Sequence, residues 1–528
     1  MDYIYFKREN RIDAYQIDFT DETCDLQRLK QVLEIDSMYA EEPQYDYIKV
    51  GPIINKPAFS TNVLNILEKI GITNLNSFNY IKLYDVNTSF TFDPMLEKVY
   101  DREEPTTQLK TVYPSKISLD NKELSKYGLF FDNYEFELYR DLFLKLNREP
   151  TFIELYDLCQ SNSEHSRHWF FRGQLNRNDE PLDQTLFQLV KSTLRIDSNS
   201  LIAFSDNSSV IQGFNVDNLK ITNNEYKNQS EIMDIVLTAE THNFPTLISP
   251  FEGANTGVGG RVRDNHATGK GAYLIGSLAG YCVGDIDFTE DYNSLKYGYK
   301  NPLNILIEAS NGASNYGNKL GEPIIGGFTR SFKTMVDGNH IEWTKPIMYS
   351  AGIGYINRNH INKELPSVGQ LVVRLGGPAY KIGLGGGFSS SVSQNSQKKH
   401  LDYDAVQRGD PLMANKLNRV IKTCIDMGDN NPIKSIHDQG AGGLANVVKE
   451  IVYPNGADID LDKVTLGDTS LHPLEIWCSE FQESDVILIN KEDLLVLTTI
   501  CEKENICCDT LGVINDSGTI VVKHNSNK

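Results

Sequence analysis

The chain is poor in cysteine. Eight cysteines occur among its 528 residues, and their spacing is irregular. Secreted domains that depend on disulfides concentrate cysteine at regular spacings, whereas cytosolic thiols are kept reduced. We therefore expect no disulfide framework and a cytoplasmic location.

Long apolar runs are also missing. No run of about 18 apolar residues occurs, which argues against a membrane-spanning helix. The first residues, Met1 to Glu9, carry charges where the apolar part of a secretory leader would have to lie, so we expect no signal peptide.

Positive charge is scarce as well. Lys and Arg number 51 against 71 Asp and Glu, giving a formal net charge of −20. Proteins that bind nucleic acid or anionic membranes present a basic face, so neither partner is expected. At 528 residues the chain is long enough for several domains, each with its own core.

The most informative stretch runs from Thr238 to Ala272. The apolar run Ile235 to Leu237 predicts a strand whose carboxyl end presents an acid, a hydroxyl, an imidazole and an amide at 240–243. We expect turns and then a glycine-rich loop over 253–260. Glycine lets backbone N–H groups approach an anion, because no Cβ intervenes and positive φ costs little.

Charged side chains border this expected loop. Arg261 and Arg263 predict phosphate contacts, because guanidinium groups bind phosphate oxygens in pairs. Glu240 and Asp264 are suited to hold one hard cation such as Mg²⁺. The stretch fits neither the G-x-x-x-x-G-K-[ST] nor the G-x-G-x-x-G pattern. A surface turn with scattered charges is the alternative interpretation.

A second polar cluster follows a predicted helix. Thr151 and Glu154 form a capping-box pattern that predicts a helix over 152–160, preceded by an amphipathic helix over 134–146. The sequence Glu164-His165-Ser166-Arg167-His168 is then expected on the loop just beyond. A solvated charge cluster is the alternative for this segment.

Periodicity places the remaining elements. The N-terminal region predicts a β-α-β-β-α-β rhythm of ferredoxin-like type, with a strand over 2–18. Further strands are expected at 272–282, 304–308, 346–356, 371–375, 433–436 and 519–522. The strand at 433–436 leads into a glycine turn and a helix over 444–452, an arrangement suited to anions because helix N-termini carry unpaired N–H groups.

Seven sequence blocks, in order along the chain, resemble the phosphoribosylformylglycinamidine (FGAM) synthase family of purine synthesis, in its large single-chain type. The blocks are N-S-E-H-S-R-H-W-F-F (162–171), the stretch from E-T-H-N-F-P to G-K-G-A (240–272), E-A-S-N-G-A-S-N-Y-G-N (308–318), G-L-G-G-G (383–387), V-Q-R-G-D-P (406–411), H-D-Q-G-A-G-G (437–443) and L-E-I-W-C-S-E-F-Q-E-S (474–484).

The resemblance implies an α+β / α/β multidomain chain. Residues 1–118 would form a ferredoxin-like assembly domain and 119–215 a helical linker carrying the S-E-H-S-R-H loop. Residues 216–365 and 366–528 would form a pair of α/β domains like those of aminoimidazole-ribonucleotide synthetase. The resemblance covers essentially the whole chain but only the front part of the large form, which continues with a second synthetase half and a glutaminase.

The family activity is the ATP-dependent conversion of formylglycinamide ribonucleotide to formylglycinamidine ribonucleotide. The substrate amide is phosphorylated to an iminophosphate, and glutamine-derived ammonia displaces the phosphate. The resemblance thus implies ATP and Mg²⁺ as cofactors and the missing second half and glutaminase as partners. It also implies that this half leaves an exposed apolar sheet face that would seek a partner.

The resemblance assigns roles to individual residues. His165 and His242 would be catalytic, and Glu240, Asp264 and Asp438 would bind the metal. Substrate contacts would come from Thr241, Asn243, Phe244, Arg263, Gln407, Glu480, Phe481 and Gln482. Nucleotide contacts would come from His168, Gly253, Ala254, Asn255, Thr256, Gly257, Val258, Gly259, Gly260, Arg261, Val262, Arg263, Asp264, Gly326, Gly327 and Phe328.

A glutaminase needs a cysteine in a tight turn and a downstream His-x-Glu. Gly280-Tyr281-Cys282-Val283-Gly284 and His340-Ile341-Glu342 offer these residue types, but Cys282 lies inside an apolar strand. We therefore expect no glutaminase in this chain. The remaining alternatives are a non-catalytic homologue that acts as a binding or scaffold protein, and a related synthetase, aminoimidazole ribonucleotide synthetase or selenophosphate synthetase. The related synthetases lack the leading domain and the S-E-H-S-R-H loop.

Overall fold

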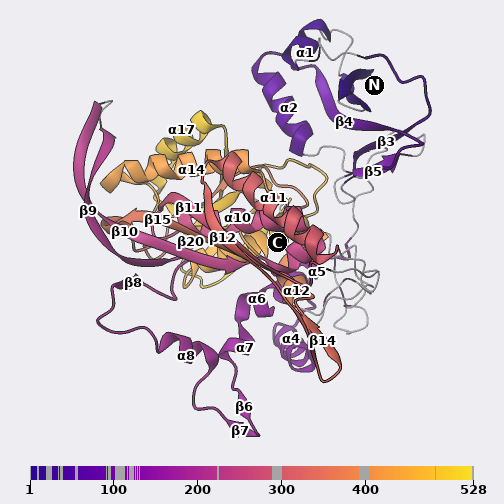
Figure 1. Ribbon diagram of the computed structural model, residues 1–528. Coiled ribbons are helices and arrows are strands. Elements are labelled where there is room, and N and C mark those ends of the chain that lie inside the picture. Colours follow the sequence, from indigo (N-terminus) through magenta and orange to yellow (C-terminus); the bar gives the residue numbers. More distant parts are fainter. Residues whose placement is uncertain are drawn as a thin grey trace. The chain divides into compact units, whose positions relative to one another are not determined.

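The computed structural model describes residues 2–8, 11–19, 26–33, 35, 40–53, 58–90, 92, 97–100, 113–115, 117, 124, 127, 129, 131–222, 225–287, 300–391, 404–481 and 483–525 (Figure 1). The chain divides into two compact units, 1–112 with 466–472, and 113–465 with 473–528. Each unit is described by itself.

The first unit contains a five-stranded antiparallel sheet in the order β1-β2-β4-β3-β5. Leu29 and Leu67, from the two helices described in this unit, pack with Phe78 of the sheet in one core. The described elements are β1 (Asp2–Arg8), β2 (Arg11–Phe19), α1 (Leu26–Val32), β3 (Tyr47–Pro52), α2 (Ala58–Lys69), β4 (Leu75–Asp85) and β5 (Glu97–Tyr100).

The element order in this unit differs from the expected ferredoxin-like rhythm. Residues 2–19 form a hairpin, with Asp2 opposite Ile17, where the sequence predicts a single strand. Apolar alternation looks the same in one strand and in two successive strands, so periodicity alone does not reveal the reversal. The described order is β-β-α-β-α-β-β, and all its strand pairs are antiparallel.

The second unit begins with a helical segment. Capping boxes start its two longer helices. One pairs Asp132 with Glu135, and the other pairs Thr151 with Glu154, as the sequence predicts. The S-E-H-S-R-H segment contains a short helix, Glu164–Arg167, where the sequence predicts a loop, and His168, with φ 55°, separates it from a second short helix. The elements are α4 (Asn133–Lys145), α5 (Phe152–Ser161), α6 (Glu164–Arg167), α7 (Trp169–Arg172), β6 (Asn176–Arg177), β7 (Glu180–Pro181) and α8 (Leu186–Lys191).

A six-stranded sheet follows, in the order β12-β11-β15-β10-β9-β8. Two helices, α10 and α11, pack on one of its faces, where Val258 and Ala313 meet Ala279 and Met348 (Figure 1). The elements are β8 (Ser200–Ile202), β9 (Ser209–Thr222), β10 (Glu225–Thr241), α9 (Asn243–Ile248), α10 (Pro250–His266), β11 (Tyr273–Val283), α11 (Pro302–Leu320), β12 (Ile324–Ser331), β13 (Lys333–Val336), β14 (Asn339–Glu342), β15 (Ile347–Asn357) and a 3-10 turn (Arg358–His360).

The glycine-rich segment is a helix, and the prediction of a loop there is wrong. Pro250 stands in the first turn of α10, and the helix comprises 17 residues, ending at His266. Its glycines permit close packing: a Cβ at Gly253 would lie 2.3 Å from the backbone of Pro245, and one at Gly259 would lie 2.8 Å from Tyr316. The packing of neighbouring elements therefore outweighs the low helix propensity of glycine.

The strand expected at 304–308 is also wrong, because these residues lie in α11. Asn301 caps this helix by accepting from the N–H of Asn304 at 2.8 Å, and Pro302 occupies its first turn. A short apolar run such as 304–308 fits a buried helix face as well as a strand. The strands expected at 272–282 and 346–356 are confirmed as β11 and β15.

A second six-stranded sheet has the order β17-β19-β16-β20-β18-β21. Leu417 and Ile421 of α14 and Leu497 of α17 pack against Val373 and Ile487 of the sheet. The elements are β16 (Leu371–Gly376), α12 (Gly386–Ser391), α14 (Pro411–Asp426), 3-10 turns (Gly428–Asn430, Leu461–Lys463 and Lys491–Asp493), β17 (Ser435–Asp438), α15 (Gly443–Val452), β18 (Gly456–Asp460), α16 (Pro473–Cys478), β19 (Ser484–Ile489), α17 (Leu494–Glu504), β20 (Cys507–Asn515) and β21 (Ile520–Lys523).

The expected strand–glycine turn–helix arrangement of this region is confirmed in β17 and α15, and the expected strands at 371–375 and 519–522 correspond to β16 and β21. Within the described residues, no helix is long and apolar enough to cross a lipid bilayer.

Candidate active site

The carboxyl end of β10 brings His242 next to the start of α10. Its backbone N–H donates to the carbonyl of Met348 at 2.8 Å, and its ring Nδ1 lies 2.6 Å from the carbonyl oxygen of Gly253. Because a carbonyl only accepts, Nδ1 carries the proton and Nε2 is the unprotonated nitrogen. Burial lowers the pKa of His242 to about 4; the Gly253 bond opposes this shift, and the charges of His165 and Arg263 add to it.

His165 reaches the same region from the linker. Its backbone N–H donates to Ser391 Oγ at 3.0 Å, and Ser391 Oγ donates to the carbonyl of Gly387 at 2.9 Å. These bonds fix α6 to α12, at the glycine turn that follows β16. His165 is exposed to solvent on one side, while desolvation by the neighbouring chain and the charge of His168 lower its pKa. The structure thus brings the two predicted catalytic histidines into one neighbourhood, from β10 and from the linker.

Three carboxylates gather beside His242. Glu240 lies at the end of β10, Asp264 lies on α10, and Asp438 ends β17 of the other sheet. Burial raises the pKa of Glu240 to about 7, with the charge of Asp438 adding to the shift. Burial also raises the pKa of Asp264, and Glu240 and Asp438 raise it further. The pKa of Asp438 is raised by burial, and the charge of Arg263 opposes that shift.

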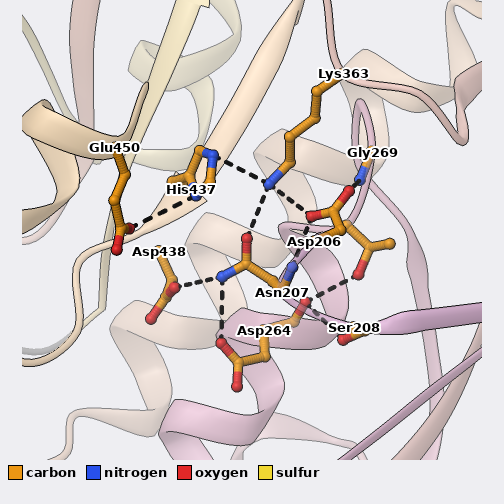
Figure 2. A network of polar contacts seen from close by, with 10 residues as sticks. Asp206, Asn207, Ser208, Asp264, Gly269, Lys363, His437, Asp438 and Glu450 are labelled. Atoms are coloured by element: carbon orange, nitrogen blue, oxygen red, sulfur yellow. Dashed lines mark hydrogen bonds and ion pairs between the residues drawn. The ribbon is translucent and has the colours of Figure 1, made fainter. Parts of the chain in front are cut away.

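The donor set suits a hard divalent cation, because carboxylate oxygens are its preferred ligands and the acids repel one another without a positive charge between them. As the side chains stand, no three or more His, Cys, Asp or Glu among the described residues lie close enough together to hold a metal ion. The side-chain amide of Asn207 bridges two of the acids. Its Nδ2 donates to Asp438 Oδ1 at 2.7 Å and to Asp264 Oδ1 at 3.4 Å (Figure 2).

Arg261 and Arg263, both expected at phosphate, have different surroundings. Arg261 is fully buried and makes two bonds to the carboxylate of Glu322, one of them 2.8 Å long. Arg263 is also buried, and its Nε lies 3.9 Å from Asp438 Oδ2. Of the two, Arg263 is the one that faces the acidic cluster.

Gln407 and Glu480 form a buried polar pair near the glycine turn. Gln407 Nε2 donates to Glu480 Oε2, and the N–H of Gly442 donates to Glu480 Oε1 at 3.1 Å. Burial raises the pKa of Glu480 to about 7, although these hydrogen bonds oppose the shift. Phe481 is fully buried and packs under Arg374, whose guanidinium lies 4.8 Å from the ring centroid. Gln482 lies outside the described residues.

The remaining predicted substrate residues lie around His242. Thr241 is exposed, and its Oγ1 accepts from Asn243 Nδ2 at 3.2 Å. Asn243 Oδ1 accepts the N–H of Met348 at 3.0 Å, which joins the start of α9 to β15. Phe244 is buried, and Lys345 lies over its ring at 5.8 Å.

The predicted nucleotide residues fall into three places. His168 is exposed on the linker. Most of the Gly253–Asp264 run is buried within α10, apart from the partly exposed Gly260 and Asp264. Gly326, Gly327 and Phe328 lie on β12 and line a cavity of about 380 Å³, together with Tyr281 and Ser310. Nucleotide contact at these positions stays a prediction.

Sequence reasoning missed the polar residues behind the acidic cluster. Asn207 follows β8, and Lys363 precedes β16. Lys363 Nζ lies 2.8 Å from Asn207 Oδ1 and 2.6 Å from Asp206 Oδ1 (Figure 2). A short Asp-Asn turn and a single lysine form no recognisable motif, so only the fold reveals that they meet.

The two six-stranded sheets, each packed against helices, and the helical linker before them define a protein of the AIR synthase class. The family model "AIR synthase related protein, C-terminal domain" matches residues 367–525, and "Formylglycinamide ribonucleotide amidotransferase linker domain" matches residues 121–168. The first match confirms the fold class expected for the second α/β domain.

Curated relatives make the assignment more specific. The chain is 43% identical over 511 residues to "Probable phosphoribosylformylglycinamidine synthase, chloroplastic/mitochondrial" of Arabidopsis thaliana, covering 89% of this chain and 36% of that protein. It is 45% identical over 519 residues to phosphoribosylformylglycinamidine synthase of Homo sapiens, covering 90% of this chain and 38% of that protein. The chain belongs to the phosphoribosylformylglycinamidine synthase family and spans a little over a third of the length of these relatives.

A solved structure shares the fold. "T. maritima PurL complexed with FGAR" aligns with a TM-score of 0.54 at 22% identity, over 74% of this chain and 53% of that chain. At this identity the match concerns the fold alone. It agrees with the expected pair of synthetase-like domains.

Proposed function

We propose that this chain contributes the first synthetase half of an enzyme that converts formylglycinamide ribonucleotide to formylglycinamidine ribonucleotide with ATP and ammonia. The observation that carries the proposal is the convergence of Glu240, His242, Asp264 and Asp438 from two sheets, with His165 added by the linker. The names of the curated relatives support it, and so does the structural relative from T. maritima, a PurL protein complexed with FGAR.

Glu240, Asp264 and Asp438 would hold Mg²⁺, which supplies positive charge for the triphosphate of ATP. Arg263 would face the transferred phosphoryl group from α10, because its guanidinium lies on the cluster side of the helix. Nucleotide contacts are proposed at His168, at Gly253–Asp264 and at Gly326–Phe328. Of the α10 glycines, Gly260 is suited best, since it faces Glu240 Oε1.

The substrate amide would lie between His165 and His242. In this reaction the amide oxygen takes up the phosphoryl group, and ammonia then replaces phosphate at the same carbon. The unprotonated Nε2 of His242 can accept a proton, because its low pKa keeps the ring neutral near pH 7. We propose Thr241, Asn243, Phe244, Gln407 and the 480–482 segment as the remaining substrate surface.

A partner is expected on the open face of the first synthetase sheet. Leu237 and Ile353 lie opposite each other on β10 and β15 and are 36% and 37% exposed. On the same face Leu278 and Phe328 are each 41% exposed. We propose that a second synthetase half covers these side chains, and that a glutaminase in the remainder of the enzyme supplies ammonia from glutamine.

Thermal unfolding with added ligands tests the function. We expect the full chain to be stabilised by Mg-ATP and by formylglycinamide ribonucleotide, since ligands that bind only the folded state raise the melting temperature. A homologue that serves only as a scaffold would respond to neither ligand. Native mass spectrometry from the source cell would identify the partner, and cell fractionation would test the proposed cytoplasmic location.

The nitrogen source has its own test. Cys282 is buried in β11, and burial raises the pKa of its thiol, which disfavours the nucleophilic thiolate. The chain alone should release no glutamate from glutamine, and Cys282→Ser should leave ammonia-dependent turnover unchanged in the completed enzyme. Glutamate release that this substitution abolishes would contradict the assignment.

A further inference from the structure

A polar network joins four segments of the second unit behind the acidic cluster (Figure 2). Asp206, Asn207 and Ser208 lie between β8 and β9, Asp264 lies on α10, Lys363 precedes β16, and His437 and Asp438 end β17. We call the Asn207 and Lys363 pair the amide clamp. It links an acid of the first synthetase domain to an acid of the second.

Asn207 is the centre of this network. Its Nδ2 donates to Asp438 Oδ1 at 2.7 Å and to Asp264 Oδ1 at 3.4 Å, so one amide engages one oxygen of each acid. The amide leaves Oδ2 of each carboxylate unengaged; Oδ2 of Asp438 lies 3.9 Å from Arg263 Nε. Carboxylates that bind a metal are in turn held by hydrogen bonds of this kind, which set their orientation.

Lys363 determines which way the amide faces. Its Nζ lies 2.8 Å from Asn207 Oδ1, and because an ammonium group only donates, the amide oxygen must point toward the lysine. The NH₂ group therefore points toward the two acids. Lys363 is itself held by Asp206, 2.6 Å away, and lies 3.3 Å from His437 Nε2.

Asp206 fixes this lysine to the backbone of the first domain. Its Oδ2 accepts the N–H of Gly269 at 3.0 Å, and its Oδ1 accepts the N–H of Asn207 at 2.7 Å. Ser208 Oγ donates to the carbonyl of Asp264 at 3.0 Å and fixes the end of α10 to the same turn. The clamp thus has a rigid support on the side that carries Asp264.

The charge balance of the region fits a divalent cation. The acids of the region outnumber its cations: Asp206, Glu240, Asp264, Asp438 and Asp485 face Lys363, Arg261 and Arg263, which leaves an excess of negative charge when the acids are ionised. An amide donor adds no charge, so Asn207 orients the acids without using up this excess.

We propose that Asn207 is a positioning residue for the metal site, which holds Asp264 and Asp438 from two domains at the spacing that one divalent cation requires, and that Lys363 acts through Asn207 by fixing its amide. The inference rests on the proposed function, because it takes these acids as metal ligands. It adds two residues that touch neither substrate nor nucleotide in that scheme.

Binding of Mn²⁺ alone to the full chain, followed by electron paramagnetic resonance, tests the proposal. Asn207→Ala changes no charge, and we expect it to weaken Mn²⁺ binding by about 10- to 100-fold, the usual effect of removing a group that orients a metal ligand. The spectrum of the bound ion should also change, since one acid is no longer held. Unchanged affinity and spectrum in the folded variant would overturn the proposal.

A double-mutant cycle with Lys363→Met examines the second part of the proposal. The charge of Lys363 repels a cation in both backgrounds, so that effect cancels and only the coupling to Asn207 remains. We expect Lys363→Met to be about three- to ten-fold more harmful to Mn²⁺ binding in the parent chain than in the Asn207→Ala background. If Asn207 were instead a direct ligand through Oδ1, Lys363 would compete with the ion and the coupling would have the opposite sign.

Lys270→Met is the matched control. Lys270 pairs with Glu364 at 2.5 Å, near the same turn, and its removal also deletes one positive charge. Its effect should add to that of Asn207→Ala without coupling. Metal-free melting is the second readout: a lower melting temperature for Asn207→Ala with unchanged Mn²⁺ affinity would mean a merely structural role. Failure of the parent chain to bind Mn²⁺ would overturn the metal site itself.

Discussion

Arg261 and Arg263 lie two residues apart on α10, and both are buried, yet they belong to different kinds of site. Arg261 makes two bonds to one acid, Glu322, and its charge acts on only one acid of the cluster, Glu240. Arg263 faces several acids, and its charge lowers the pKa of Glu240, Asp438 and others against their burial. The Arg261–Glu322 pair is neutral, whereas the acids around Arg263 keep an excess of negative charge.

This difference separates structural from functional charge. A buried pair that is fully matched gains nothing from a ligand, because no charge is left to neutralise. A buried group of acids with raised pKa values stores electrostatic repulsion, which a bound cation relieves. Residue type and burial alone do not distinguish the two arginines. What distinguishes them is the number of acids that each one faces.

The largest effect is expected on catalysis, at the candidate active site that Arg263 faces. In the enzyme completed with its missing parts and supplied with ammonia, His165→Ala should lower turnover by about 10²- to 10⁴-fold, the usual contribution of a group that handles protons. ATP binding should change little, because His165 lies on α6 and not on α10. His168→Ala serves as the control and should cost less. Parental turnover by His165→Ala would contradict the assignment.

The next largest effect concerns stability. Arg261→Met leaves Glu322 charged and buried, which should lower the free energy of unfolding by about 3–5 kcal/mol. Urea denaturation measures this loss, and the variant should respond to Mg²⁺ as the parent chain does. Arg263→Met also removes a buried cation, but Mg²⁺ can neutralise the acids that it faced. Its loss should therefore be recovered in part by Mg²⁺, and equal recovery in both variants would remove the distinction.

Much of the local structure could be predicted from sequence. The capping box at Thr151 and Glu154 specifies the start of α5 through two backbone donors, and these contacts are local. The apolar run before Glu240 is likewise a local signal, and it indicates a strand that ends near Glu240. The glycine-rich stretch is ambiguous, because glycine favours both loops and close helix packing. The deciding contacts, with Pro245 and Tyr316, come from other elements.

The candidate site was predictable only in part. Glu240, Asp264 and Asp438 stand in motifs, and the structure brings them together beside His242. Asn207 and Lys363 stand in no motif, and 156 residues separate them in sequence. Their meeting depends on how two domains close over one another, which no local pattern contains.

A pair of glycine substitutions distinguishes the two faces of α10. Gly253→Ala places a Cβ 2.3 Å from the backbone of Pro245, which should cost about 1–3 kcal/mol, as overpacking does. Gly260→Ala places its Cβ 3.0 Å from Glu240 Oε1, the movable end of a side chain, and replacing glycine in a helix gains about 1 kcal/mol. Thermal unfolding should therefore show a loss only for Gly253→Ala. Equal losses would contradict the packing interpretation.

A pH-dependent effect on stability concerns Glu480, a buried acid that faces an amide and a backbone N–H. Burial raises its pKa from an ordinary value of 4.5 to about 7. Between these values the unfolded chain has released the proton and the folded chain still holds it, so stability falls as pH rises from 4.5 to about 7 and levels off above.

Glu480→Gln keeps the shape of the side chain and cannot ionise. The difference in unfolding free energy between parent and variant should therefore change across this pH range, in favour of the variant at higher pH. Other acids titrate in the same range in both proteins, so only the difference is diagnostic. A difference that does not vary with pH would mean that Glu480 is already ionised in the fold, with Gln407 and Gly442 sufficient to hold its charge.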